Sequence, residues 1–154
     1  MLLQEESGLA RVIDPAGGSW YVEDLTERLA EAADGPAAMT VVEIAQAHRI
    51  AIVYGYPERG DDGAIYNSVQ LIDAHGRSLS NYRKTHLFGE LDRSMFSPGA
   101  DYFPVVELEG WKVGLLICYD YRFPELYRHY NQLGIDVVLQ SFHNARSMVV
   151  ADPE

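Results

Sequence analysis

Two helical patterns come first in the chain. Apolar residues recur at spacings of three and four from Tyr21 to Ala33, and the turn residues at 34–36 close this run, which predicts a helix. Pro36 then stands where the first turn of a helix accepts proline, and the apolar positions after it predict a second helix ending at His48. Residues 1–19 contain the turn-forming stretch DPAGGS and are expected to be irregular.

From Ile50 the helical spacing gives way to continuous or alternating apolar runs. The run Ile50–Tyr56, ended by Pro57, predicts a buried strand, and 65–73 and 79–84 predict the next two strands of an antiparallel meander. The stretch 85–101 has no clear period, so we expect a loop there.

The remaining pattern predicts a hairpin, a helix and one more strand. The hairpin joins 103–108 to the almost wholly apolar run 111–117 through a tight Glu109-Gly110 turn. A helix with Pro124 near its first turn follows, and then a short buried strand at 137–139. This order of elements predicts a layered α/β or α+β domain with helices packed on sheet.

Composition and charge narrow the class of protein. A chain of 154 residues favours a single domain. With 12 Lys+Arg against 23 Asp+Glu the net charge is −11, which argues against nucleic acid and anionic membrane surfaces as partners. The sequence has neither an apolar run long enough to cross a bilayer nor a signal-peptide pattern. We therefore expect a cytoplasmic protein with no membrane partner.

Cys118 is the single cysteine of the chain, which excludes an internal disulfide and a thiolate zinc cluster. It follows a buried strand and precedes a helix start, where backbone N–H groups and the helix dipole favour a thiolate and an adjacent oxyanion. A lone cysteine after such a strand is also typical of a small buried hydrophobe. The position alone leaves both interpretations open.

A lysine at a strand end is the second candidate for chemistry. Lys84 closes the predicted strand 79–84, and the loop after it carries Glu90 and Asp92. A rigid strand end can bring a cation and a carboxylate to one place. The alternative is an ordinary solvated lysine.

Two long segments, YRKTHLFGELDRSMFSPG (82–99) and GLLICYDYRFPELYR (114–128), resemble the nitrilase superfamily of carbon-nitrogen hydrolases. Lys84 and Cys118 lie 34 positions apart within them. Supporting phrases follow in the family's order at 50–60, 65–77 and 103–114. The resemblance covers about residues 29–146 and implies a truncated α-β-β-α sandwich in a partial hydrolase domain, 29–154.

The resemblance also implies a chemistry: hydrolysis of a small amide, carbamoyl amine or nitrile through a Glu-Lys-Cys triad. Cys118 matches the nucleophile that forms an acyl-enzyme thioester. Lys84 matches the lysine that stabilises the tetrahedral oxyanion, together with the backbone N–H of Tyr119. Asp92, with Glu90 as the other candidate, matches a supporting carboxylate. This chemistry needs no metal and no organic cofactor, and the family implies a homo-oligomer.

The sequence departs from the family at the triad glutamate, which has no counterpart upstream of Leu29. The phrases at 56–58 and 123–125 contain Pro-Glu but belong to other segments of the family pattern. We therefore expect a hydrolase of impaired activity, and the alternative is an inactive nitrilase-like fragment that acts only as an association module. His143 and Asn144 follow a strand end and are expected to line the substrate pocket.

The first part of the chain resembles a different family. Residues 4–26 are similar to a segment of the barrel domain of methylmalonyl-CoA mutases. We therefore expect residues 1–28 to be a foreign segment in a chimera with a junction near 25–30. The mutases' cobalamin signature, Asp-x-His-x-x-Gly, is not satisfied at 73–78, so neither cobalamin nor mutase activity is expected.

Overall fold

The strands in the described part of the chain form two three-stranded sheets that pack against each other. The computed structural model describes residues 20–100 and 103–142, so the predictions for 1–19, for His143 and for Asn144 lie outside the described residues. The first sheet has the order β1-β2-β3 and the second β4-β5-β6. The strands are β1 (Ile52–Arg59), β2 (Ile65–Ile72), β3 (Ser78–Arg83), β4 (Val105–Leu108), β5 (Trp111–Ile117) and β6 (Val137–Ser141).

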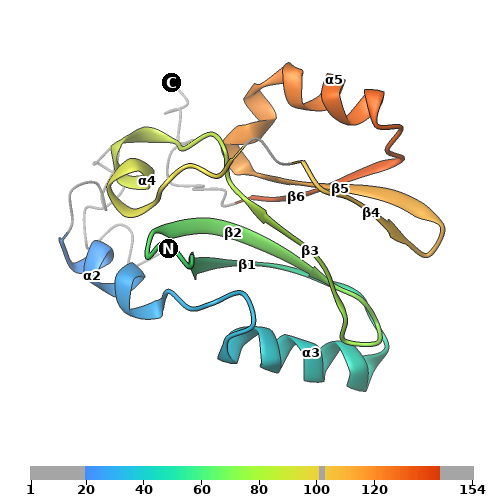
Figure 1. Cartoon of the computed structure of the whole chain (residues 1–154), viewed down its shortest axis with the longest axis horizontal. Coiled ribbons are helices and arrows are strands. Elements are labelled where there is room, and N and C mark those ends of the chain that lie inside the picture. The colour runs from blue at the N-terminus through green and yellow to red at the C-terminus, as the bar shows by residue number, and fades with distance from the viewer. Residues whose placement is uncertain (1–19, 101–102, 143–154) are drawn as a thin grey trace, which may run out of the picture.

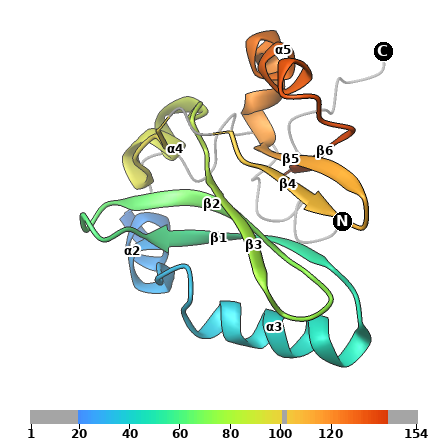
Figure 2. The same cartoon turned by 45° about the vertical axis from the view of Figure 1, so that its right-hand side comes forward.

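Helices lie outside this pair of sheets. Figures 1 and 2 show α3 against the outer side of the first sheet and α5 above the second, while β2 faces β5 and β1 faces β6. This arrangement gives the layer order α-β-β-α. The helices are α2 (Trp20–Leu29), α3 (Pro36–His48), α4 (Gly89–Met95) and α5 (Pro124–Gln132), and a 3-10 helix, η2, covers Cys118–Arg122.

The first helix is shorter than predicted, because Glu31 has a different role. Its backbone N–H donates to the carbonyl of Pro57 (3.2 Å) and its carbonyl accepts from the N–H of Arg59 (2.8 Å). Its carboxylate accepts from the N–H of Ala37, at 3.1 and 3.2 Å, in the first turn of α3. These bonds draw the chain out of α2 after Leu29.

The prediction that Pro57 ends the first strand is wrong. Pro57 lies inside β1, opposite Asn67 of β2. Its carbonyl points outward to Glu31, so its nitrogen lies on the outer side as well. Because β1 is an edge strand, the missing N–H costs no bond to β2.

The meander, the hairpin of β4 and β5 and the last strand are confirmed, but the last strand, predicted to be buried, is half-buried along its length. β1, β2 and β3 pair antiparallel, β4 and β5 form a hairpin, and β6 pairs with β5 in parallel. The predicted tight turn has positive φ at Glu109 (50°) and Gly110 (82°). The prediction that 85–101 is only a loop is wrong, because this stretch contains α4. That helix is too short to show a period in the sequence.

The hydrophobic core lies between the sheets and under α5. Its buried members are Val69, Leu71 and Tyr82 of the first sheet, Val113, Leu115, Leu116 and Ile117 of β5, and Leu126 and Tyr130 of α5. The hydroxyl of Tyr130 accepts from the N–H of Leu115 (3.1 Å) and donates to its carbonyl (2.8 Å), which fixes α5 on β5. The carboxyl end of β5, where Cys118 follows, is therefore anchored from within the core.

The face of the first sheet under α3 is polar. Glu58 is buried, and its carboxylate accepts hydrogen bonds from Ser68 (2.6 Å), Asn81 (2.8 Å) and Arg83 (2.6 Å). Burial opposes ionisation, but these bonds outweigh it and hold the pKa of Glu58 below its usual range. A cavity of about 670 Å³ separates this face from part of α3.

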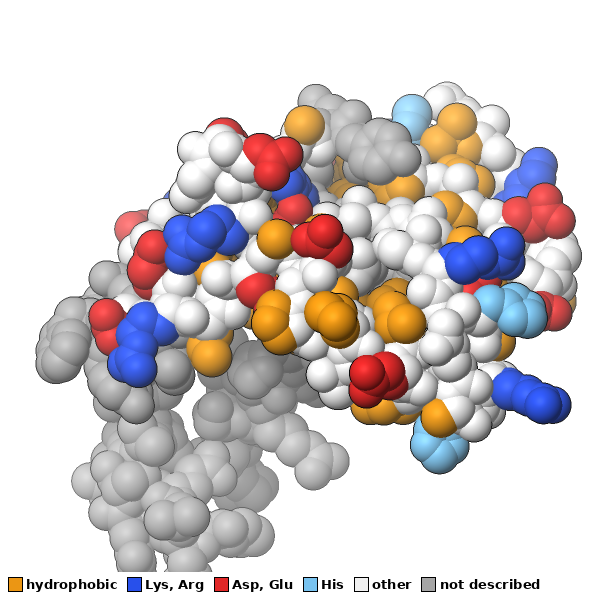
Figure 3. Space-filling view, turned by 60° about the horizontal axis from the view of Figure 1, so that its bottom comes forward, with side chains coloured by type: hydrophobic (Ala, Val, Ile, Leu, Met, Phe, Trp, Pro, Cys, Tyr) orange, Lys and Arg blue, Asp and Glu red, His pale blue; other side chains and the backbone are white. Residues whose placement is uncertain are grey.

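On the side of the molecule where α3 lies, this helix exposes large apolar side chains, and one of them, Met39, also lines the cavity. Figure 3, seen from this side, shows hydrophobic groups in the middle of the face with charged groups around them. Met39 is 63% exposed and Ile44 is 44% exposed.

Candidate active site

Lys84 follows β3 directly and is held by backbone bonds on both sides. Its N–H donates to the carbonyl of Asn67 (2.8 Å), and its carbonyl accepts from the N–H of Gly99 (2.8 Å). The residue is only 2% exposed, so it is not a solvated surface lysine.

The structure distinguishes between the two acids of α4. The ammonium of Lys84 forms an ion pair with the carboxylate of Asp92, which also accepts the N–H of Phe88 at 2.9 Å. Glu90 lies 3.7 Å from Arg93 and its side chain is 94% exposed. Lys84 and Asp92 are therefore brought together, and Glu90 is not brought to the lysine.

Cys118 is the first residue of η2, directly after β5, and it is a half-buried free cysteine. Its φ is 39°, a left-handed conformation that costs a residue with a side chain about 1–2 kcal/mol. The amide of Gln140 donates to its carbonyl at 3.0 Å. The α-helix begins at Pro124, as predicted, and a short 3-10 helix that was not predicted lies between β5 and that start.

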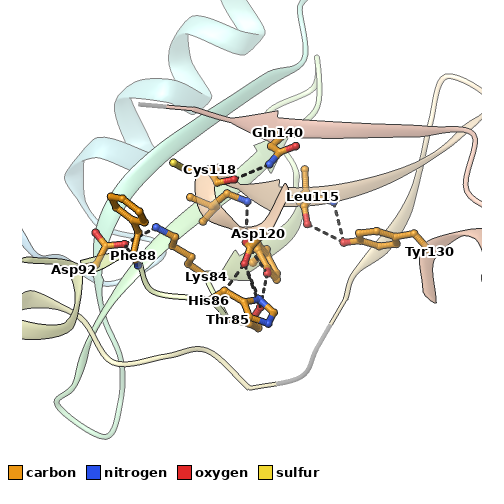
Figure 4. A network of polar contacts seen from close by, with 12 residues as sticks. Lys84, Thr85, His86, Phe88, Asp92, Leu115, Cys118, Asp120, Tyr130 and Gln140 are labelled. Carbon is orange, nitrogen blue, oxygen red and sulfur yellow. Dashed lines mark hydrogen bonds and ion pairs between the residues drawn. The ribbon is translucent and has the colours of Figure 1, made fainter. Parts of the chain in front are cut away.

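A buried carboxylate connects the cysteine turn to the lysine loop. Asp120 is fully buried, and its Oδ2 accepts from the N–H of Ile117 (3.0 Å) and the hydroxyl of Tyr82 (3.0 Å). Its Oδ1 accepts from the N–H of His86 (3.2 Å) and contacts the Nδ1 of the same residue (3.0 Å). Figure 4 shows Asp120 between the strand end that carries Cys118 and the segment with His86.

Aromatic rings pack the two segments together. The ring of Tyr119, the residue after the cysteine, lies 5.0 Å from that of Phe88 and 5.5 Å from that of Phe123. Phe123 in turn stacks on His86 at 3.6 Å. Phe88 is 49% exposed, so one side of this cluster faces solvent. These ring contacts join the segment that carries Cys118 and Tyr119 to the segment that follows Lys84.

Sequence reasoning missed the roles of Asp120 and Gln140. One signal was available for Asp120: an acid within the first turn after an apolar strand is a common backbone acceptor. Burial and the neighbouring Asp120 carboxylate also raise the pKa of Tyr82 above its usual range. Gln140 carried no local signal, because its bond to Cys118 joins residues 22 positions apart.

Within residues 20–100 and 103–142, no cluster of three or more His, Cys, Asp or Glu is placed to hold a metal ion. In the same ranges no helix has the length and apolar character needed to span a membrane.

Comparisons with known proteins point to one family. The family model of the carbon-nitrogen hydrolases matches residues 12–152. A hydrolase in the pqqF 5′ region of Pseudomonas protegens is 63% identical over 111 residues, covering 72% of this chain and 39% of that protein. An (R)-stereoselective amidase of Pseudomonas sp. is 42% identical over 112 residues, covering 73% and 39%.

Solved structures agree. An amidase from Nesterenkonia sp. matches with a TM-score of 0.64 and 33% identity, over 69% of this chain and 40% of that one. One structure of this amidase carries acrylamide added at its active-site cysteine, and another holds butyramide. The chain spans about two fifths of the length of these relatives.

The resemblance of residues 4–26 to mutases finds no support in these comparisons, and the hydrolase match begins inside that segment, at residue 12. The predicted domain boundary after residue 28 falls within α2 and stays a prediction. The nitrilase resemblance is confirmed, with a partial nitrilase fold over about 70% of the chain. The chain belongs to the carbon-nitrogen hydrolase family.

Proposed function

We propose that the chain supplies the cysteine and the lysine of an amidase-type hydrolase. The observation that carries the proposal is the ion pair of the buried Lys84 with Asp92, beside a segment that Asp120 joins to the turn bearing Cys118. A cation kept away from water and fixed by a carboxylate is suited to stabilise negative charge that develops on a substrate oxygen.

The reaction follows from these groups. The Cys118 sulfur, after losing its proton, adds to the carbonyl carbon of an amide, and the carbonyl oxygen becomes an oxyanion beside the Lys84 ammonium. The backbone N–H of Tyr119 is the second proposed donor to that oxyanion. The intermediate collapses, the C–N bond breaks, and the nitrogen takes up the proton that the cysteine lost and leaves as ammonia or an amine. Water then adds to the thioester carbonyl, the C–S bond breaks, and the carboxylic acid and the free thiol are released.

We propose that proton transfer is the slow step of the reaction. For the chain as given, we propose Asp92 as the substitute for the family's triad glutamate, because it contacts the lysine and Glu90 does not. A base engaged in an ion pair is less available, and general-base assistance contributes a factor of roughly 10² to 10⁴. We therefore expect slow turnover.

We propose small amides as substrates. The (R)-stereoselective amidase and the butyramide-bound amidase are related to this chain and are described as acting on or holding amides. The exposed ring of Phe88 beside Tyr119 adds an apolar wall at the site, which suits a substrate with a short apolar acyl group.

Ammonia release from a panel of small amides and carbamoyl amines, butyramide included, tests the proposal. The purified chain should release ammonia slowly, and Cys118→Ala and Cys118→Ser should not. Acrylamide provides a second readout, because an adduct can be located by mass on the single cysteine. Release that persists in Cys118→Ala overturns the proposal.

A second candidate is an inactive association module, favoured by the exposed Met39 and Ile44 on α3. Sedimentation of the wild type and of Met39→Lys, measured over a range of concentrations, separates the two candidates. Self-association that Met39→Lys weakens, without turnover by the wild type, favours the module. Turnover that depends on Cys118 favours the hydrolase.

A further inference from the structure

Asp120 holds two segments that are distant in sequence. One of its oxygens accepts from Ile117, the residue before the cysteine, and from Tyr82, two residues before the lysine. The other accepts the backbone N–H of His86, two residues after the lysine. Both Lys84 and Cys118 are thus flanked by residues that bind one carboxylate.

His86 adds a side-chain bond to this link. Its Nδ1 lies 3.0 Å from Oδ1 of Asp120 and 2.9 Å from the hydroxyl of Thr85. The imidazole is 30% exposed and Asp120 is fully buried, so the histidine is the more accessible member of the pair. Stacking of the imidazole on Phe123 fixes the plane of the ring.

The cysteine turn needs such restraint. Cys118 has a φ of 39°, and a strained backbone persists only where surrounding contacts determine it. Asp120 restrains the turn through Ile117, and Gln140 restrains it through the Cys118 carbonyl.

We infer that Asp120 and His86 form a positioning pair that sets the placement of the Cys118 thiol relative to the Lys84 ammonium. This inference rests on the proposed function for its meaning in turnover, but its geometric content does not. Neither residue acts on the substrate: Asp120 fixes the two backbones, and His86 fixes Asp120. A small displacement of reacting groups is costly in such chemistry, about 100-fold for 1 Å.

Two substitutions of His86 test the pair. Asparagine can place an amide N–H close to the position of Nδ1, whereas alanine cannot. We expect His86→Ala to lower kcat by about 10- to 100-fold with little change in KM. His86→Asn should recover most of that loss. Equal activity of the two variants, or an unchanged kcat in His86→Ala, overturns the inference.

Asp120→Asn is compared with Asp73→Asn as a matched control. Asp73 is also a buried aspartate that accepts backbone N–H groups, from His75 and Arg77, but it lies in the β2–β3 turn. Asp120→Asn should lower kcat and Asp73→Asn should not. If Asp120→Asn does not fold, the His86 pair decides the question.

Alkylation of the single cysteine by iodoacetamide gives a readout that needs no substrate. A cation beside a thiol favours the reactive thiolate, so a misplaced Lys84 should slow the reaction at neutral pH. His86→Ala should react more slowly than the wild type and His86→Asn should not. If the wild type releases no ammonia from any amide, the proposed function fails, while this comparison still supports or overturns the positioning pair.

Discussion

Lys84 and Asp92, eight residues apart, form an ion pair between the end of β3 and α4, and the lysine side chain is 3% exposed. Asp92→Asn would leave the ammonium buried without its counter-charge, which is costly. We expect unfolding free energy to fall by about 2 kcal/mol or more, and kcat to fall by about 10². Chemical denaturation and ammonia release measure the two effects.

Glu90→Gln is the control for this prediction, because it changes a carboxylate of the same helix that is 94% exposed. Its effect on stability should stay within about 0.5 kcal/mol. Equal losses in the two variants would contradict the assignment of Asp92 to the site.

The local pattern was sufficient to predict the hairpins and the layered class, because strand pairing between neighbours follows from apolar periodicity and turn residues such as Glu109-Gly110. It was not sufficient at Pro57, where the outcome depends on the strand lying at a sheet edge. An edge position is a property of the assembled sheet and has no signal in the strand itself.

The site, like the fold, could be predicted only in part from the sequence. The resemblance indicated Lys84 and Cys118, but the choice between Asp92 and Glu90 depends on the direction in which α4 presents each side chain. The network of Asp120 joins segments 34 to 38 positions apart, and a single sequence does not reveal such contacts.

Strain at Cys118 predicts an unusual order of stability among its variants. At a φ of 39°, glycine is unstrained and alanine is strained. The free energy of unfolding of Cys118→Gly should therefore be about 1 kcal/mol higher than that of Cys118→Ala. Thermal and denaturant unfolding measure the difference, and both variants should be inactive.

Ser141 of β6 provides the comparison, because it is not among the described residues with positive φ. There the order should reverse, with glycine about 0.5–1 kcal/mol less stable than alanine. The same order at both positions would show that the turn at Cys118 is not strained.

Gly99 is predicted to be essential for the placement of Lys84. A Cβ at this position would lie 2.3 Å from the carbonyl oxygen of Arg83, and the Gly99 N–H bonds the Lys84 carbonyl. Gly99→Ala should therefore cost about 1–3 kcal/mol and lower kcat. At Gly55 the nearest atom to an added Cβ is 3.6 Å away, so Gly55→Ala should leave activity unchanged. Similar losses in the two variants would argue against a specific role for the Gly99 contact.

The lowered pKa of Glu58 predicts how the free energy of unfolding depends on pH. Because the folded state holds its pKa below the usual value of 4.5, the carboxylate contributes stability that is present above that pH. As the pH falls through the lowered pKa, the proton binds and the contribution is lost. Urea denaturation of the wild type and of Glu58→Gln, measured between pH 7 and about pH 3, should show a difference that is largest near neutrality and shrinks in acid. Arg83 keeps its charge over this pH range, so the trend reports protonation of the Glu58 carboxylate and not of its arginine partner. A difference that stays constant with pH would mean that the Glu58 carboxylate is not stabilised by its three hydrogen-bond donors.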